Sequence, residues 1–211
     1  MRVVAFSLVL LAPSGVLAEE PFDRPALEAF LDTLEADYAA LTSLSYRFEQ
    51  VQRMPELTKE IELVGTVLHQ RPAEVRLEVR GMENFDLLSD GTTVWFIDRD
   101  FGDVESFSIA ELRTAPQSRL LPPLLLDNPA RWRLDFEVVE FEENGSRRRL
   151  VLEPGASANR RFESVTLVFK GRRLKESTVH YGEGDEAITR YSDWKRVGKV
   201  SHAIFRYRSE K

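Results

Sequence analysis

The chain has 211 residues, of which 43% are hydrophobic and 30% charged, and this composition suits one globular domain with a sizeable core. The formal net charge is −6 and no segment is strongly basic, which argues against a nucleic-acid partner. The sequence contains no cysteine, so no disulfide can form and no lipid can be attached to an N-terminal thiol. We therefore expect a soluble protein held together by its core alone.

The first 18 residues have the pattern of a secretory signal peptide. Arg2 is followed by an apolar run from Val3 to Leu11, then by a breaker segment and small residues that end at Ala18. A membrane anchor is the alternative, but it needs about 20 apolar residues, and this run is shorter. We expect cleavage after Ala18 and a single mature domain of residues 19–211. Removing Arg2 takes the net charge from −6 to −7.

One helix is predicted near the start of this domain. The apolar residues from position 25 recur at spacings of three and four, as on one stripe of a helix. Asp23 is expected to cap the helix, and Pro25 suits its first turn. The residues of the stripe are Leu27, Phe30, Leu31, Leu34, Tyr38 and Leu41.

The rest of the domain reads almost entirely as strands, because apolar and polar residues alternate. Turns are expected at Asp90-Gly91, Asn144-Gly145 and Lys170-Gly171. A strand is expected from Trp132, and a change of phase at Val138 and Val139 indicates a bulge in it. Counting to a last strand at "SHAIFRYR", residues 201–208, gives about eleven antiparallel strands in one sheet, too large to stay flat. The predicted fold is therefore mainly β, a single curled sheet or incomplete barrel covered by the N-terminal helix and a short helical lid.

The lid is predicted at residues 110–130, the only long interruption in the strand series. The adjacent prolines at 122 and 123 exclude a continuous helix or strand. We expect short helical turns that cover the mouth of the curled sheet, and a core-filling connection is the alternative. The apolar residues of this lid are Leu120, Leu121, Leu124, Leu125 and Leu126.

Several motifs follow one another along the chain in an order that points to a known family. They read "LSYRFEQ" at 44–50, "GTVLHQRP" at 65–72, "EVRLEV" at 74–79 and "LLSDGTTVWFID" at 87–98, followed by the Pro-Leu-rich lid. With the leading helix and the last strand, they resemble the LolA family of periplasmic lipoprotein carriers. The chain departs from many members in lacking a Pro-Pro-Gly-containing tail, and residues 129–161 match little beyond pattern.

The resemblance implies an apolar cavity between the sheet and its helical covers. It also implies a periplasmic carrier, which we expect to be a monomer and to need no cofactor. Such a carrier takes an acylated lipoprotein from an inner-membrane ATP-driven releasing complex and passes it to an outer-membrane receptor. The expected cavity and lid residues are Phe30, Leu34, Phe48, Leu63, Leu88, Trp95, Leu120, Leu121, Leu124, Leu125 and Leu126. Within the pairs Leu87/Leu88 and Trp95/Phe96, the sequence leaves open which residue faces inward.

Arg71 is the polar residue that the resemblance singles out. The matching arginine of the family holds the lid closed through lid backbone carbonyls, and Arg71 could do so for carbonyls freed by Pro122 and Pro123. The alternative is an arginine at a strand end, paired in water with a carboxylate.

Other functions have less support in the sequence. The carboxylates of residues 98–105 lack the full spacing of a calcium loop, so a solvated hairpin and no metal are expected. There is no nucleophile elbow, and His69, His180 and His202 are scattered, so an enzyme is not expected. Two hypotheses stand beside the lipoprotein carrier. One is a carrier or sensor of another amphiphile, such as a glycolipid or a pigment-like lipid, and the other is a hydrolase with paired carboxylates.

Overall fold

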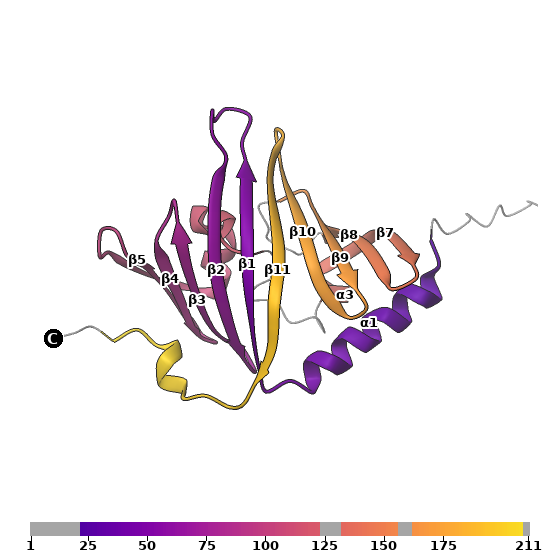
Figure 1. Cartoon of the computed structure of the whole chain (residues 1–211), viewed down its shortest axis with the longest axis horizontal. Helices are drawn as coiled ribbons and strands as arrows, with labels where there is room; N and C mark the ends of the chain where they lie inside the picture. The colour runs from indigo at the N-terminus through magenta and orange to yellow at the C-terminus, as the bar shows by residue number, and fades with distance from the viewer. Residues whose placement is uncertain (1–21, 123–131, 156–161, 209–211) are drawn as a thin grey trace, which may run out of the picture.

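The computed structural model describes residues 22–122, 132–155 and 162–208. The predicted signal peptide and the leucines at 124–126 lie outside these residues. Eleven strands form one antiparallel sheet. Figure 1 shows this sheet with β1 and β11 near its middle. The strands are β1 Ser43–Arg53, β2 Ile61–Gln70, β3 Glu74–Gly81, β4 Phe85–Asp90, β5 Thr93–Asp98, β6 Val104–Ser108, β7 Phe136–Asn144, β8 Arg147–Pro154, β9 Ser164–Lys170, β10 Arg173–Gly182 and β11 Asp185–Val197.

The sheet is open, as predicted for an incomplete barrel. Its order is β6-β5-β4-β3-β2-β1-β11-β10-β9-β8-β7, so β6 and β7 are its two edges and are not paired with each other. The first and last strands, β1 and β11, pair at the centre and divide the sheet into two halves. We call the face covered by the helices the inner face, and the opposite one the outer face.

The helix α1, Arg24–Ala39, covers the inner face of the β7–β11 half (Figure 1). Its predicted cap is confirmed, because the Asp23 carboxylate accepts a hydrogen bond of 3.0 Å from the Ala26 N–H. Leu27, Phe30, Leu31 and Leu34 of the predicted stripe are buried. The spacing of apolar residues therefore both forms this helix and fixes the side that it turns to the sheet.

The lid segment, which we define as residues 109–121, covers the inner face of the β1–β6 half. It consists of the short helix α2, Ile109–Thr114, and the 3-10 turn η1, Pro116–Leu120. The Ser108 hydroxyl accepts from the Glu111 N–H and the Glu111 carboxylate accepts from the Ser108 N–H, which makes a capping box at the start of α2. Leu112 and Leu121 are buried against the sheet.

The predicted hairpin turns are confirmed between β4 and β5, β7 and β8, and β9 and β10. Gly91, Gly145 and Gly171 have φ values of 92°, 58° and 62°, a region that glycine enters at little cost. The predicted bulge in β7 is also confirmed, since the pairing with β8 shifts between Val138 and Glu140.

The strand predicted from Trp132 begins later, at Phe136. Residues Trp132–Asp135 form a single helical turn, α3, in which Leu134 is 71% exposed. Arg133 joins this turn to α1, because its guanidinium donates to the Asp32 carboxylate at 2.7 Å. The alternating pattern of these residues was therefore misleading, because it does not reveal that they form a turn in contact with α1.

The outer face of β3 and β4 is covered by the described segment that follows β11. After β11 the chain turns back and forms the 3-10 turn η3, His202–Phe205, so the prediction of a strand at residues 201–208 was wrong. Phe205 is fully buried, Arg76 donates to the Ile204 carbonyl, and Arg206 pairs with Asp90 at 3.2 Å. The segment after β11 is thus bound to the outer face, away from the lid segment.

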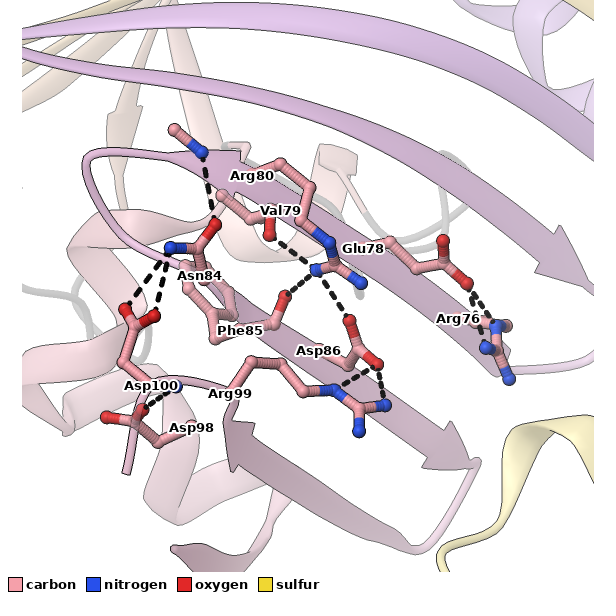
Figure 2. A network of polar contacts seen from close by, with 11 residues as sticks. Arg76, Glu78, Val79, Arg80, Asn84, Phe85, Asp86, Asp98, Arg99 and Asp100 are labelled. Carbon is pink, nitrogen blue, oxygen red and sulfur yellow. Dashed lines mark hydrogen bonds and ion pairs between the residues drawn. The ribbon is translucent and has the colours of Figure 1, made fainter. Parts of the chain in front are cut away.

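Polar contacts hold the same outer face together near the β3–β4 turn (Figure 2). The buried carboxylate of Asp86 accepts hydrogen bonds of 2.9 Å from both Arg80 and Arg99. Arg80 also donates to the Phe85 carbonyl at 3.2 Å. The Asp86 charge is thus paired with both arginines, and we assign these contacts a structural role.

Candidate lipid-binding face

The inner face carries two apolar clusters, one under each helical cover. The α1 cluster consists of Leu27, Phe30, Leu31, Leu34, Phe136, Phe141, Leu150, Leu152, Val165, Leu167, Phe169, Val179 and Ala187. The lid cluster consists of Phe48, Leu63, Val67, Val75, Leu77, Val79, Phe85, Leu87, Val94, Leu112, Leu121 and Tyr191. Both clusters are lined by the residue types that pack against hydrocarbon.

Most of the described residues predicted to line this face do lie on it. Phe30 and Leu34 belong to the α1 cluster, Phe48, Leu63 and Leu121 belong to the lid cluster, and Leu120 packs against the latter. Whether any of them contacts a lipid stays a prediction. Leu124, Leu125 and Leu126 lie outside the described residues.

The prediction was wrong for Leu88 and Trp95, which lie on the outer face. These two residues pair with each other across β4 and β5, whereas Leu87 pairs with Phe96 and both pack in the lid cluster. Successive side chains of a strand point to opposite faces, so the two pairs are on opposite sides. The pattern of β3 contained the missing information, because its inward-facing Leu77 pairs with Leu87.

Between the two clusters, the centre of the inner face is polar, which the sequence reasoning missed. Gln50 and Gln52 of β1, Ser177 of β10 and Thr189 of β11 have exposed fractions of 5% or less. Gln50 pairs with Thr189 across the two central strands. We call these four residues the polar band. The sequence did contain a signal for it, because Gln50 and Gln52 follow Phe48 at alternate positions of β1 and therefore lie on the same face as Phe48.

The lid segment is attached to this polar band through one backbone carbonyl. The side-chain amides of Gln50 and Gln52 donate to the Arg119 carbonyl at 3.2 and 2.7 Å. Two donors from one strand therefore hold the described end of the lid segment on the inner face. The family resemblance implies a contact of this kind, between a side chain and a lid carbonyl, for Arg71.

The Arg119 side chain extends the attachment to the other half of the sheet. Its guanidinium pairs with the Asp185 carboxylate at 2.9 Å and lies 4.8 Å from the centre of the Tyr181 ring. Burial raises the pKa of the Tyr181 phenol to about 12, and the nearby Arg119 charge opposes this shift. The lid segment thus contacts β1 through its backbone and the β10–β11 hairpin through Arg119.

Three aromatic side chains continue the inner face toward the other end of β1. The rings of Tyr46 and Trp194 stack with centres 4.5 Å apart, and Tyr191 lies 5.8 Å from Tyr46. Residues 191 and 194 would face opposite sides of a regular strand. Asp193, with a φ of 53°, forms a bulge that turns Trp194 onto the inner face.

Arg71 contacts the end of α1 in the described residues. Its guanidinium donates to the Ala39 carbonyl and lies 5.6 Å from the centre of the Tyr38 ring. A cation at the last carbonyls of a helix is favourable, so Arg71 stabilises the end of α1. The lid carbonyls beyond Pro122 lie outside the described residues, and the latch role of Arg71 therefore stays a prediction.

His69 lies half-buried beside this contact. Its ring lies 5.7 Å from that of Tyr38. Burial, with a smaller contribution from the Arg71 charge, lowers the pKa of His69 to about 4. The histidine is therefore neutral at physiological pH. Together with Tyr38 and Arg71 it joins α1 to β2, and we call these three residues the anchor.

The described residues show no group of three His, Cys, Asp or Glu side chains that could hold a metal ion. Residues 98–105 form the turn and flanks of the β5–β6 hairpin, where the Asp98 carboxylate accepts hydrogen bonds from the N–H groups of Asp100 and Phe101. Among the described helices, none is both long and apolar enough to cross a membrane.

An open antiparallel sheet, covered on its apolar inner face by a helix and a lid, defines a lipid- or lipoprotein-carrier type of fold. The chain belongs to the family described as outer membrane lipoprotein carrier protein LolA, whose model matches residues 39–208. No curated protein matches it.

Solved structures share this fold at low sequence identity. A LolA superfamily protein from Nitrosomonas europaea is 12% identical, with a TM-score of 0.50 over 85% of this chain and 97% of its own. A conserved uncharacterized protein from Thermus thermophilus is also 12% identical, with a TM-score of 0.54 over 88% of this chain and 96% of its own.

Proposed function

We propose that this protein is a periplasmic carrier that shields the acyl chains of a lipoprotein on its inner face and moves the lipoprotein from the inner to the outer membrane. The family match over residues 39–208 is the observation that supports this most strongly. In this proposal, an inner-membrane ATP-driven complex supplies the cargo and an outer-membrane receptor takes it. The segment up to Ala18 directs export and is removed.

Physical chemistry explains why such cargo needs a cover. Burying an acyl chain contributes about 0.8 kcal/mol for each CH₂ group, so an unprotected chain returns to the nearest bilayer. The lid cluster offers an apolar surface of the required kind, and Leu121 connects that surface to its cover. We propose that the acyl chains enter beneath the lid segment, where they replace contacts of Leu121 with the sheet.

The first experiment identifies the cargo. Protein purified from periplasm is studied by native mass spectrometry, followed by lipid extraction. A bound acylated polypeptide supports the lipoprotein carrier. A glycolipid or a pigment-like lipid in its place supports the alternative, a family member that carries another amphiphile.

The second experiment tests where the chains bind. Leu121→Asp places a charge against the lid cluster, which costs several kcal/mol unless the charge escapes. We expect weaker binding of a fluorescent naphthalene sulfonate and poorer transfer of a labelled lipoprotein to acceptor membranes. Leu57→Asp is the matched control, because Leu57 is 48% exposed. Equal binding by both variants would contradict binding beneath the lid.

A further inference from the structure

The polar band contains hydrogen-bonding groups that the fold itself leaves unused. The Gln50 carbonyl oxygen Oε1 is buried and has no hydrogen-bond partner among the described residues. The Thr189 hydroxyl lies near the Tyr191 phenol but makes no hydrogen bond of acceptable geometry. Buried polar groups are nearly always paired, because an unpaired one costs about 1–3 kcal/mol. An unused acceptor between two apolar clusters therefore points to a ligand.

Among the described residues, the glutamine amides of the polar band donate only to the lid segment. Both glutamine amides donate to the Arg119 carbonyl, and Gln52 makes the shorter bond at 2.7 Å. When the lid segment lifts to admit an acyl chain, this carbonyl leaves and two buried N–H groups lose their acceptor. A carbonyl brought by the ligand can replace it with the same geometry.

From these two observations we infer that the polar band recognises the acyl linkage of the cargo, meaning a carbonyl with a hydroxyl or N–H donor close to it. The carbonyl accepts from Gln50 and Gln52 in place of the Arg119 carbonyl. The neighbouring donor bonds to Gln50 Oε1 or to the Thr189 hydroxyl. This inference rests on the proposed carrier function and deepens it, since it names the chemical group of the cargo that the inner face recognises.

The positions of the apolar clusters agree with this assignment. Phe48 precedes the two glutamines on the same face of β1 and belongs to the lid cluster, while Ala187, the partner of Gln52, belongs to the α1 cluster. A linkage held at the polar band can therefore direct hydrocarbon toward the lid cluster. The lid segment and the cargo compete for the same donors. In the empty protein the Arg119 carbonyl satisfies the two glutamine amides and the lid stays closed, whereas in the loaded protein the cargo carbonyl satisfies them and the lid can stay open.

Matched probes isolate the linkage from the chain. 1-Dodecanoylglycerol and 1-O-dodecylglycerol have the same chain length and the same hydroxyls, and only the ester has the carbonyl. Binding is measured by displacement of a fluorescent naphthalene sulfonate from the purified protein. We expect the ester to bind about tenfold more tightly, because the ether leaves two buried donors unpaired. Equal affinities would overturn the inference while the carrier function stands.

Variants show whether the polar band is responsible. In Gln52→Met, and in Gln50→Met with Gln52→Met, the ratio of the two affinities should fall toward one. A loosened lid changes both affinities alike, so the ratio reports the linkage alone. Thr189→Val should weaken both glycerol probes by severalfold, whereas Thr178→Val, the same change on the outward side of β10, should not. An unchanged ratio in the glutamine variants would overturn the assignment.

A third probe distinguishes two sources of the same chemistry. N-Dodecanoylethanolamine carries the amide of an N-acylated polypeptide, whereas 1-dodecanoylglycerol carries the ester of a glycerolipid. A preference for either one over the ether supports the inference and indicates the source. If none of the three probes binds, the carrier function fails, and this inference fails with it.

Discussion

The two halves of the inner face are covered in different ways. The α1 half is closed by a 16-residue helix with four buried apolar side chains, and the Phe30 ring meets the Phe169 ring edge to face at 5.1 Å. The lid half is closed by a 6-residue helix, in which Leu112 is buried, and by a 5-residue 3-10 turn that has no buried residue of its own. Its described polar attachments to the sheet pass through Arg119 and the Gln117–Glu105 bond.

This difference indicates which cover moves. Short segments with few buried contacts open at a lower free-energy cost than the core of a domain. We therefore expect α1 to stay in place while the lid segment opens locally. The predictions below test that comparison.

The largest effect should come from the fixed cover. Phe30→Ala removes a ring that is 4% exposed, and the free energy of unfolding should fall by about 3–5 kcal/mol. Urea denaturation measures the change. Phe101→Ala is the control, since that ring is 83% exposed and its loss should cost less than about 0.5 kcal/mol. A small effect of Phe30→Ala would mean that α1 is no more firmly packed than the lid segment.

Acid should weaken the anchor between α1 and β2. The pKa of His69 is about 4 in the folded protein against 6.5 for an exposed histidine, so the unfolded chain binds more protons between these values. Stability from this group is complete above pH 6.5 and is lost as the pH falls toward 4, by about 3 kcal/mol.

The matched variant for this prediction is His69→Asn, which cannot take up the proton. Denaturation curves at pH 7 and pH 4 should show that the variant loses less stability on acidification than the wild type. Parallel losses in both proteins would show that other groups cause the acid sensitivity.

Beneath the lid, the sheet itself should tolerate little change. A Cβ at position 65 would lie 2.4 Å from the Phe48 ring and 2.7 Å from the Glu78 carbonyl oxygen. Gly65→Ala should therefore cost about 1–3 kcal/mol in unfolding free energy, measured by thermal or urea denaturation. At Gly198 a Cβ meets nothing within 4 Å, so Gly198→Ala serves as the control. Similar stabilities of the two variants would contradict the expectation that the sheet beneath the lid is tightly packed.

The smallest predicted effect is on hydrogen exchange, and it distinguishes the role of Arg119 from that of Arg71. Arg119→Gln removes a half-exposed ion pair and a contact with Tyr181, worth together about 1 kcal/mol, so hydrogen exchange in residues 109–121 should become about fivefold faster. Arg71→Leu should instead speed exchange in the last turn of α1. Faster exchange of the lid segment in Arg71→Leu would support the latch role that the family resemblance implies.

Local patterns were sufficient to predict much of the fold. The spacing of Leu27, Phe30 and Leu34 predicts α1, and glycines in turns predict the hairpins, because these signals depend on neighbouring residues. Gln50 and Gln52 were missed because an inward-facing polar residue is recognised only once its partner is known, and Arg119 lies far away in the sequence. Arg133 and Phe205 were missed for the same reason, since both act through long-range contacts.

The pairing of β1 with β11 has a consequence for the order in which the chain can fold. A nascent chain that ends before Asp185 can form the β1–β6 and β7–β10 segments, but β1 and β10 then lack their shared neighbour. Only β11 joins the two parts, and such long-range pairing is slow. Completion of the sheet is thereby postponed until β11 has been synthesised, which is compatible with the export that we propose.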